Sequence, residues 1–377
     1  PLDSALSLPE RCYSDLLMES AELLGVEGAY DKGLRVLARL LGLSLSENAL
    51  ETGVSEHSQA VEGYYAQKGP FPVEEEGPIL VAQADGKGVP MVRNETAQLK
   101  ARRGKGDKKT RKKEAIAIAA YTVAPYVRTA QDVVDALFKK VAPPGQRPRP
   151  CHKQVFASMQ GKEHTIKRLA AWAAQREGQH IRERVALTDG SEPLQRQVLE
   201  QLPGFSLVLD MIHVDEYLWE AGTAIYGETD SHRDDWVAEQ LLDILSSRAE
   251  TVIQRLEVKA SKLCPDSQAA KTLRRVAAYF RRNLSYMDYA RYLQHGWPIG
   301  TGVIEGTCRH LVKDRMELSG MRWSMSGAEA ILALRSVNEN GDWDDFHEYR
   351  RTQRHQRLYG TPINRDWLDQ VERLEIN

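Results

Sequence analysis

The stretch of sequence that decides the fold is PILVAQADG, at residues 78–86. It is a short apolar run that ends in Asp-Gly, the pattern of a buried strand that stops at a turn. RERVALTDG at 182–190 repeats this pattern. EAIAIAAYTVAP at 114–125 and FSLVLDMIHV at 205–214 are further apolar runs of strand length. Together these four runs predict a β-sheet.

Helices are expected between the strands, because residues 129–140, 163–178 and 192–202 have amphipathic, helix-like patterns. A hairpin is expected at Gly86-Lys87-Gly88, since VPMVRN at 89–94 has the pattern of a second strand. This order of strands and helices predicts an α/β fold whose sheet mixes antiparallel and parallel strands.

Both flanks of this core are predicted to be helical. Residues 9–67 carry apolar residues at helical spacing, with Gly42 and Gly53 expected to separate short helices. Residues 31–67 fit either a DNA-reading helix-turn-helix or, as we favour, an accessory or dimerisation bundle. Residues 214–290 give no strand signal and predict a long run of helices.

Composition places the chain among ordinary globular proteins. Its 377 residues are 42% hydrophobic and 28% charged, which excludes a wholly disordered chain. The longest apolar runs are too short to cross a bilayer, and no secretory signal opens the sequence. Four scattered cysteines without a CxxC pair indicate reduced thiols rather than a disulfide framework or zinc site. We therefore expect a cytoplasmic protein without membrane contact.

The formal net charge of −2 hides a strong asymmetry. Residues 1–97 carry 7 Lys and Arg against 16 Asp and Glu, residues 98–184 carry 21 against 7, and residues 185–377 carry 23 against 30. The local balances are therefore −9, +14 and −7. A basic middle between acidic ends indicates a localised surface for a polyanion.

The basic residues concentrate in one loop, at 98–114, which is expected to overhang the sheet. It fits either a solvated loop or a DNA contact. The DNA-binding candidates are these loop residues together with two arginines further on: Lys100, Arg102, Arg103, Lys105, Lys108, Lys109, Arg111, Lys112, Lys113, Arg309 and Arg322.

Carboxylates supply the chemical clue. Asp85 and Asp189 each end a predicted strand, and side chains at strand ends can converge on one edge of an α/β sheet. Paired carboxylates there would suit Mg²⁺, although Asp-Gly is also ordinary turn chemistry. Glu305 follows Gly300-Thr301-Gly302, where a helix is expected to begin, and arginines and lysines surround it. That Glu fits either a ligand or a helix-dipole partner.

Four motifs in order carry a family resemblance. They are VAQADGKGVPM, ALTDGSEPL, LVLDMIHVDEYLW and GTGVIEGTCRHLVKDRMELSGMRWS. This set resembles bacterial insertion-sequence transposases of the Kra-four family, which are DDE enzymes distantly similar to Mutator-like transposases. The resemblance covers roughly residues 1–350. It implies an RNase H-like mixed sheet core with an all-helical insertion and an N-terminal helical domain.

The resemblance also assigns roles to residues. Asp85, Asp189 and Glu305 match the catalytic, metal-binding carboxylates, and Asp210 and His213 match an Asp-x-x-His strand beside the site. The implied chemistry is two-metal phosphoryl transfer with two Mg²⁺ ions, for which Mn²⁺ is an expected substitute. Asp85 would bridge both ions, while Asp189 and Glu305 would each complete one site. We expect Asp210 and His213 to support the site without touching metal. Composition alone leaves open whether Asp189 or Asp210 is the second ligand, and whether His213 is only a hydrogen-bonded histidine of a buried strand.

The implied function is a DNA transposase that cuts and joins transposon ends. Its partners would be double-stranded DNA, at transposon ends and target, and further copies of itself in a homodimer or larger oligomer at the nucleoid. Two alternatives stay open: a non-catalytic, domesticated DNA-binding derivative, and an RNase H-like nuclease or resolvase that cuts without joining. The predicted divisions are 1–70 helical, 78–213 core, 214–296 helical insertion, 297–340 return to the core and 341–377 tail.

The basic loop gives a prediction that rests on nine Lys and Arg residues within 100–113. If the loop tracks phosphates, neutralising four of them should weaken binding to every DNA sequence. The slope of log K against log salt should shrink by roughly 0.9 per lost phosphate contact. Affinity measured between about 50 and 200 mM salt checks this, and an unchanged affinity and slope would leave a solvated loop.

Overall fold

A computed structural model describes residues 3, 7–96, 112–143, 145–318 and 320–360. Its centre is a five-stranded sheet in the order β3-β2-β1-β4-β5. β1 and β2 are antiparallel, as are β2 and β3, whereas β4 and β5 run parallel to β1. The strands are β1 Ile79–Pro90, β2 Lys112–Val123, β3 Cys151–Ser158, β4 Glu183–Thr188 and β5 Ser206–Leu209.

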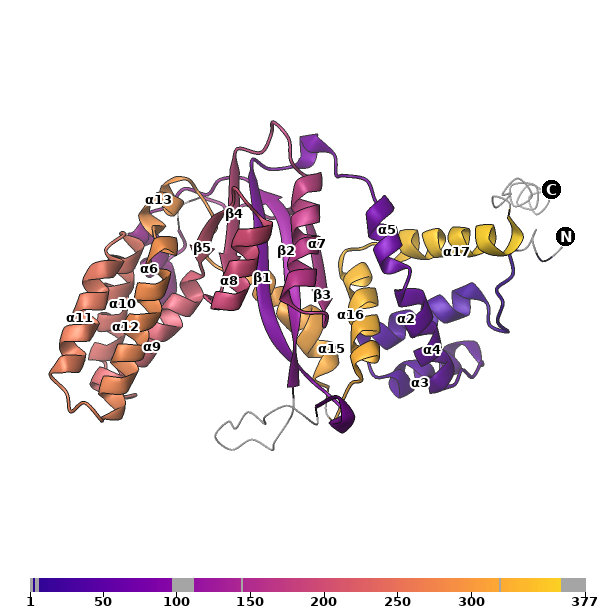
Figure 1. The fold of residues 1–377 in the computed structure, drawn as a ribbon, viewed down its shortest axis with the longest axis horizontal. Coiled ribbons are helices and arrows are strands. Elements are labelled where there is room, and N and C mark those ends of the chain that lie inside the picture. Colours follow the sequence, from indigo (N-terminus) through magenta and orange to yellow (C-terminus); the bar gives the residue numbers. More distant parts are fainter. Residues whose placement is uncertain (1–2, 4–6, 97–111, 144, 319, 361–377) are drawn as a thin grey trace.

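Helices flank this sheet on two sides (Figure 1). On one side lie α2–α5 of the N-terminal part with α16 and α17 from the C-terminal part; on the other lies a lobe made of α9–α13. The first group is α2 Asp15–Glu27, α3 Tyr30–Leu41, α4 Glu47–Ser58, α5 Val61–Gln67, α16 Met325–Glu339 and α17 Trp343–Tyr359. The lobe is α9 Met211–Tyr226, α10 His232–Leu245, α11 Ala249–Ser261, α12 Gln268–Asn283, η3 Leu284–Tyr286 and α13 Tyr289–Gln294.

The remaining helices connect the strands or return the chain to the sheet. A π-helix, η4, continues α14 directly, so one helical segment runs from Gly302 to Met316. These elements are η1 Val73–Glu75, η2 Arg93–Thr96, α6 Ala130–Phe138, α7 Lys162–Gln175, α8 Glu192–Gln201, α14 Gly302–Thr307, η4 Cys308–Lys313 and α15 Asp314–Met316. No helix among the described residues is both long and apolar enough to span a bilayer.

The sheet is buried on both faces. From Ala115 to Val123 every residue of β2 is buried, which explains why that run is almost wholly apolar. Alternate residues of a strand face opposite sides, so Ile79, Val81, Gln83 and Asp85 share one face of β1. The backbone N–H of Ile304 donates to Oε1 of Gln83 at 3.0 Å, which identifies that face as the one against α14.

The prediction of a mixed α/β sheet is confirmed, but the predicted hairpin at residues 86–88 is wrong. β1 runs unbroken to Pro90, and Gly86 and Gly88 pair with β2 opposite Ile116 and Glu114. A Cβ on Gly86 would lie 2.4 Å from the Glu114 carboxylate. The glycines therefore make room for long side chains of the neighbouring strand rather than form a turn.

Three further expectations differ from the structure. No strand was predicted at 151–158, where β3 lies, because only the second half of β3 is buried. The run at 205–214 is strand only as far as Leu209, since Asp210 caps α9. Gly53 lies inside α4 rather than at its end, whereas Gly42 does end α3, with φ at 68°. The RNase H-like character of the core and the proposed domain divisions stay predictions.

Two buried arginines tie the N-terminal helices to the segment that carries Glu305. Arg315 is 1% exposed, and its Nε donates to the carbonyl of Gly25 at 2.9 Å. Arg335 is 3% exposed and donates to the carbonyls of Val26 and Leu311. Gly25 and Val26 lie in the last turn of α2, where carbonyls have no partner within the helix.

Replacing Arg335 by Met should lower the free energy of unfolding by roughly 3 kcal/mol, because the carbonyls it binds would stay buried without a donor. Urea denaturation followed by circular dichroism measures this. Arg281→Met is the matched control, since Arg281 is 46% exposed in its ion pairs with Glu250 and Glu257 and should contribute little to stability. An equal effect of both substitutions would contradict this account.

Candidate active site

The register of two parallel strands places Asp85 beside Asp189. The pairing of β1 with β4 runs from Ile79 opposite Glu183 to Gln83 opposite Leu187. If the same register is continued by two residues along both segments, Asp85 lies opposite Asp189. Burial, together with the nearby Asp189 carboxylate, raises the pKa of Asp85 above its usual value. Two carboxylates held this close repel each other, so the pair favours a cation.

Asp85 lies within β1 rather than at its end, as its position in the pairing with β2 shows. Its Oδ1 accepts the backbone N–H of Gly86 at 2.6 Å. Its Oδ2 accepts the thiol of Cys308 at 3.4 Å, from the π-helix that follows α14. Asp85 is half-buried, and the pairing of β1 with β4 stops before it.

Asp189 directly follows β4 and begins a tight turn. Its Oδ1 accepts the backbone N–H of Ser191 at 2.9 Å. Gly190 has φ at +83°, in the region that favours glycine, and a Cβ there would lie 2.5 Å from the hydroxyl of Tyr279. That hydroxyl donates to the carbonyl of Asp189 at 2.7 Å. The helical lobe therefore fixes the backbone of the second carboxylate.

Glu305 stands on α14, over the face of the sheet that carries Asp85. It is exposed, and its Oε1 accepts the hydroxyl of Thr301 at 2.9 Å. Gln83 holds the beginning of this helix to β1 through the Ile304 amide. Oxygens of Glu305 and Asp210 and a ring nitrogen of His213 all lie within 4.8 Å of one another.

Asp210 is completely buried and its oxygens are already engaged. Its Oδ1 accepts the backbone N–H of Thr301 at 2.8 Å. Its Oδ2 accepts the backbone N–H of His213 at 3.1 Å and lies 2.6 Å from Nδ1 of the same residue. The hydrogen bond that Nδ1 of His213 donates to Asp210 raises the pKa of His213 to about 9, which favours a positively charged imidazole at neutral pH.

The structure connects the five predicted site residues through neighbouring pairs: Asp85 interacts with Asp189 and His213, and His213 and Asp210 lie within 4.8 Å of Glu305. Asp85 and Asp189 come from neighbouring strands, Glu305 from the helix after the lobe, and Asp210 and His213 from the start of α9. Asp210 links α9 to the chain before α14, because it binds Thr301. Carboxylate oxygens are the ligands that Mg²⁺ prefers, so these residue types suit that ion. Within the described residues, however, the ligand atoms within 4.8 Å of Glu305 belong to Asp210 and His213, not to Asp85 and Asp189.

Sequence reasoning missed three residues that position these carboxylates. Gln83 is buried in β1 and also donates to the hydroxyl of Tyr121 at 3.1 Å. Cys308 and Tyr279 contact Asp85 and Asp189 as described above. A polar side chain in the middle of the apolar run 78–84 was a signal for Gln83, whereas nothing local pointed to the other two.

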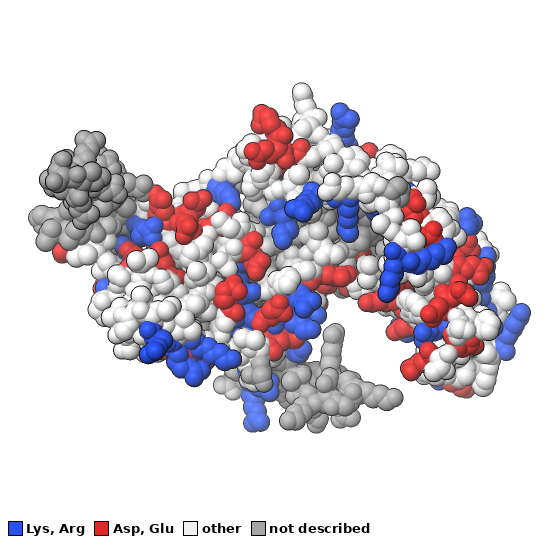
Figure 2. Space-filling view, turned by 180° about the vertical axis from the view of Figure 1, so that it is seen from behind, with Lys and Arg blue, Asp and Glu red and all other residues white. Residues whose placement is uncertain are grey.

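The predicted DNA contacts are scattered or lie outside the described residues. Lys100, Arg102, Arg103, Lys105, Lys108, Lys109 and Arg111 belong to the part that the structure does not describe. Lys112 pairs with Glu317, and Nζ of Lys113 lies 3.6 Å from Glu95. Arg309 is exposed. In Figure 2, basic and acidic side chains interleave over one face, which is hollowed beside the helical lobe.

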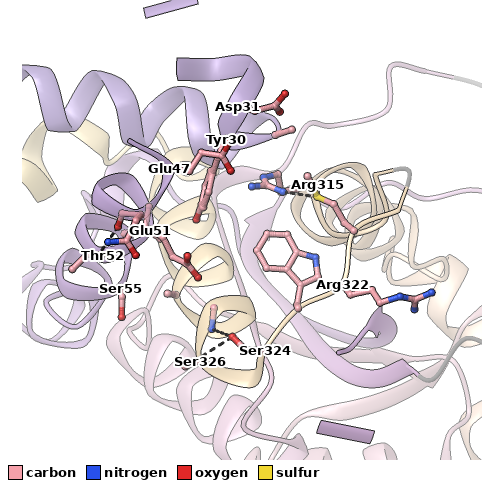
Figure 3. A pocket seen from close by; sticks show the side chains of 17 residues that line it. Tyr30, Asp31, Glu47, Glu51, Thr52, Ser55, Arg315, Arg322, Ser324 and Ser326 are labelled. Carbon is pink, nitrogen blue, oxygen red and sulfur yellow. Dashed lines mark hydrogen bonds between the residues drawn. The ribbon is translucent and has the colours of Figure 1, made fainter. Parts of the chain in front are cut away.

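Arg322 lines a cavity of about 740 Å³ between α3, α4 and α16, away from the carboxylates. Figure 3 shows Arg322 pointing away from the ring of Tyr30, while Glu47 and Glu51 lie on the other wall. Acidic residues in that wall make this cavity unsuited to a phosphate.

Comparison with known proteins adds little. No protein-family model matches the sequence, and no curated protein matches it. Among solved structures, the Drosophila P element transposase strand transfer complex aligns with 96% of this chain and 86% of that chain. Sequence identity there is 9% and the TM-score is 0.30. A likeness of that size carries no weight for fold or activity, and the resemblance to the Kra-four family stays a prediction.

Replacing Gln83 by Met, which is similar in size, should destabilise the start of α14. The Ile304 amide and the Tyr121 hydroxyl would both lose a partner in a buried place, at a cost of roughly 1–3 kcal/mol. Hydrogen exchange at residues 303–306 should accelerate more than exchange in α7. Exchange that rises equally in both helices would instead indicate a general loss of stability.

Proposed function

We propose that this protein is a DDE-type DNA transposase, which cuts DNA at transposon ends and joins the ends to target DNA. The observation that supports the proposal is a chain of neighbouring groups at the end of β4. Asp85 interacts with Asp189 and His213, and Glu305 lies within 4.8 Å of Asp210 and His213. The mixed sheet would then be the RNase H-like core that the sequence resemblance implies. The helical lobe between Asp210 and Glu305 would be its insertion.

The three carboxylates would hold two Mg²⁺ ions, with Asp85 shared and Asp189 and Glu305 each completing one site. When bound, such ions lower the pKa of a water nucleophile and stabilise the leaving oxygen in phosphoryl transfer. Mn²⁺ should replace Mg²⁺, because both prefer oxygen ligands. The raised pKa of Asp85 fits a group that needs a nearby cation to stay ionised.

Asp210 and His213 would support this site through hydrogen bonds and charge, without binding the metal ions. Asp210 holds the His213 ring through Nδ1 and so directs the opposite ring nitrogen outward. The positively charged imidazole, 30% exposed, would orient a DNA phosphate beside Glu305. The same Asp210 anchors Thr301, whose hydroxyl positions Glu305.

The partners that this function requires are double-stranded DNA and further copies of the chain. The basic loop and Arg309 are the proposed phosphate contacts, and the protein would work at the nucleoid as a homodimer or larger oligomer. A nuclease that cuts without joining is the rival activity, because the same carboxylates serve both. Incubation of pre-cleaved transposon ends with a plasmid separates them, since only a transposase yields joined products.

The two aspartates should respond differently to loss of charge. Asp189→Asn should abolish cleavage while folding and binding to transposon ends survive, because a metal ligand is lost. Asp210→Asn should leave activity reduced roughly 10–100-fold, the usual scale for a group that supports a ligand. Cleavage assays with Mg²⁺ and with Mn²⁺ on both variants measure this.

Asp230→Asn is the matched control, since Asp230 makes a similar contact to His232 on the exposed surface of the lobe. It should retain full activity. If Asp210→Asn is inactive and Asp189→Asn remains active, the catalytic set becomes Asp85, Asp210 and Glu305. A crystal soaked with Mn²⁺ would then show the ion against Asp210.

A further inference from the structure

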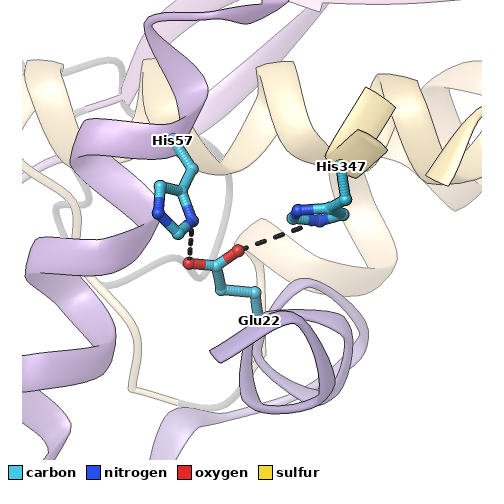
Figure 4. A group of neighbouring side chains, drawn as sticks. All are labelled: Glu22, His57 and His347. Atoms are coloured by element: carbon cyan, nitrogen blue, oxygen red, sulfur yellow. Dashed lines mark ion pairs between the residues drawn. The ribbon is translucent and has the colours of Figure 1, made fainter. Parts of the chain in front are cut away.

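A second group of metal-ligating side chains lies away from Asp85 and Asp189, between two N-terminal helices and α17. Glu22 of α2, His57 of α4 and His347 of α17 point toward one another (Figure 4). One atom from each lies within 4.8 Å of the other two. Nδ1 of His57 is 2.6 Å from Oε1 of Glu22, and Nε2 of His347 is 3.9 Å from Oε2.

The facing atoms of this group are buried, and two of them have no close partner. The side chains of Glu22 and His347 are 0% and 1% exposed. Nδ1 of His57 pairs with Oε1 of Glu22, but Oε2 of Glu22 and Nε2 of His347 are buried polar atoms without a hydrogen bond and lie 3.9 Å apart. Such atoms cost free energy unless something pairs with them, so two of them facing each other at that distance indicate an absent partner.

We propose that Glu22, His57 and His347 bind one divalent transition-metal ion, with Zn²⁺ as the preferred ion. Two imidazole nitrogens and a carboxylate are a common zinc donor set, whereas Mg²⁺ prefers oxygen ligands alone. Zn²⁺ takes four ligands in most sites. The second Glu22 oxygen or a water completes the set.

The surroundings admit such an ion. A cavity of about 200 Å³ lies beside the group, and its lining includes His57, Gly53, Met18 and Arg350. Gly53 faces the group from α4, and a Cβ there would lie 2.9 Å from Oε1 of Glu22. A glycine inside a helix lowers stability on its own, but here it leaves the space that the Glu22 carboxylate occupies.

Arg350 is the group that competes with the ion. Its Nη1 lies 2.9 Å from Nε2 of His57, and its Nε donates to Nδ1 of His347 at 3.3 Å. These contacts leave the ring protons on the nitrogens that face Glu22. Metal binding moves each proton to the outer nitrogen, with no net release, and Arg350 then turns to Glu19 and Asp15, which lie 3.4 and 3.5 Å from its Nη2.

The ion would crosslink the N-terminal helices to the last described helix. Glu22 and His57 belong to the N-terminal helices and His347 to the last described helix, so a single ion joins three helices that are far apart in sequence. Metal binding to such a site is coupled to folding, because the unfolded chain does not hold the ligands together. The expected role is structural, separate from the carboxylates at the sheet edge.

The test uses the full-length protein, stripped with a chelator, given one equivalent of Zn²⁺ in excess Mg²⁺ and passed through a desalting column. Elemental analysis should find about one zinc per chain, and Tm should rise by roughly 5 °C. Co²⁺ in place of Zn²⁺ should give visible absorption bands of a four-coordinate site. Less than about a tenth of a zinc per chain, with no Co²⁺ bands, overturns the proposal and leaves Arg350 as the counter-ion of Glu22.

Variants locate the ion. His347→Gln and His57→Ala should each lose the zinc and the gain in Tm, while His232→Ala, which removes a surface histidine paired with Asp230, should keep both. The double variant Asp85→Asn, Glu305→Gln should also keep the zinc, since it alters only the sheet edge. Zinc that stays in His347→Gln but disappears from the double variant contradicts the proposal. If the histidine variants do not fold, the Co²⁺ spectrum of the unaltered protein against that of the double variant decides.

Discussion

The parallel pairing of β1 with β4 is the constraint on which the candidate site depends. Residues 79–83 pair with 183–187, and the same register brings Asp85 opposite Asp189 just beyond the end of β4. A slip of one residue would turn one aspartate to the other face of the sheet and separate the carboxylates. The apolar side chains of β1 and β4 are buried on both faces, so burial fixes this register and offsets the repulsion between two acids at its end.

The helical lobe matters to the site because the chain enters the lobe after Asp210 and returns from it at Thr301, which is bound to Asp210. Its first residue follows Asp210, and the chain returns at Thr301, whose amide binds Asp210 at 2.8 Å. One buried carboxylate therefore closes the loop of about ninety residues that contains the lobe. Gln83 makes the second connection, from β1 to the beginning of α14. Glu305 is thus held to the strand of Asp85 through buried polar contacts, although it lies 220 residues further along the chain.

Local patterns predicted the parts of the fold that depend on burial. The apolar runs before Asp85 and Asp189 are strands because the sheet is covered on both sides. Asp189 directly follows its strand as predicted, whereas Asp85 lies within β1 and not at its end. The prediction of a hairpin was wrong because glycines in a strand-like run can either form a turn or make room for a neighbouring side chain. Gly86 makes room for Glu114. β3 was missed because Cys151–Lys153 are polar or half-exposed, so only its last five residues read as buried. The contacts of Gln83, Cys308 and Tyr279 join distant segments, and local sequence does not encode them.

The difference between Asp189 and Asp210 shows how burial can decide the role of a residue. Both follow a short parallel strand, and composition alone does not separate them. Asp210 is completely buried and accepts two backbone amides besides its contact with the His213 ring, so its charge is already compensated by groups of the chain. Asp189 is half-buried and its carboxylate accepts one amide, from Ser191, while Asp85 stands opposite as a second acid. A cation gains most where negative charge is least compensated, which supports the proposal that the ion lies between Asp85 and Asp189 while Asp210 holds the surrounding chain.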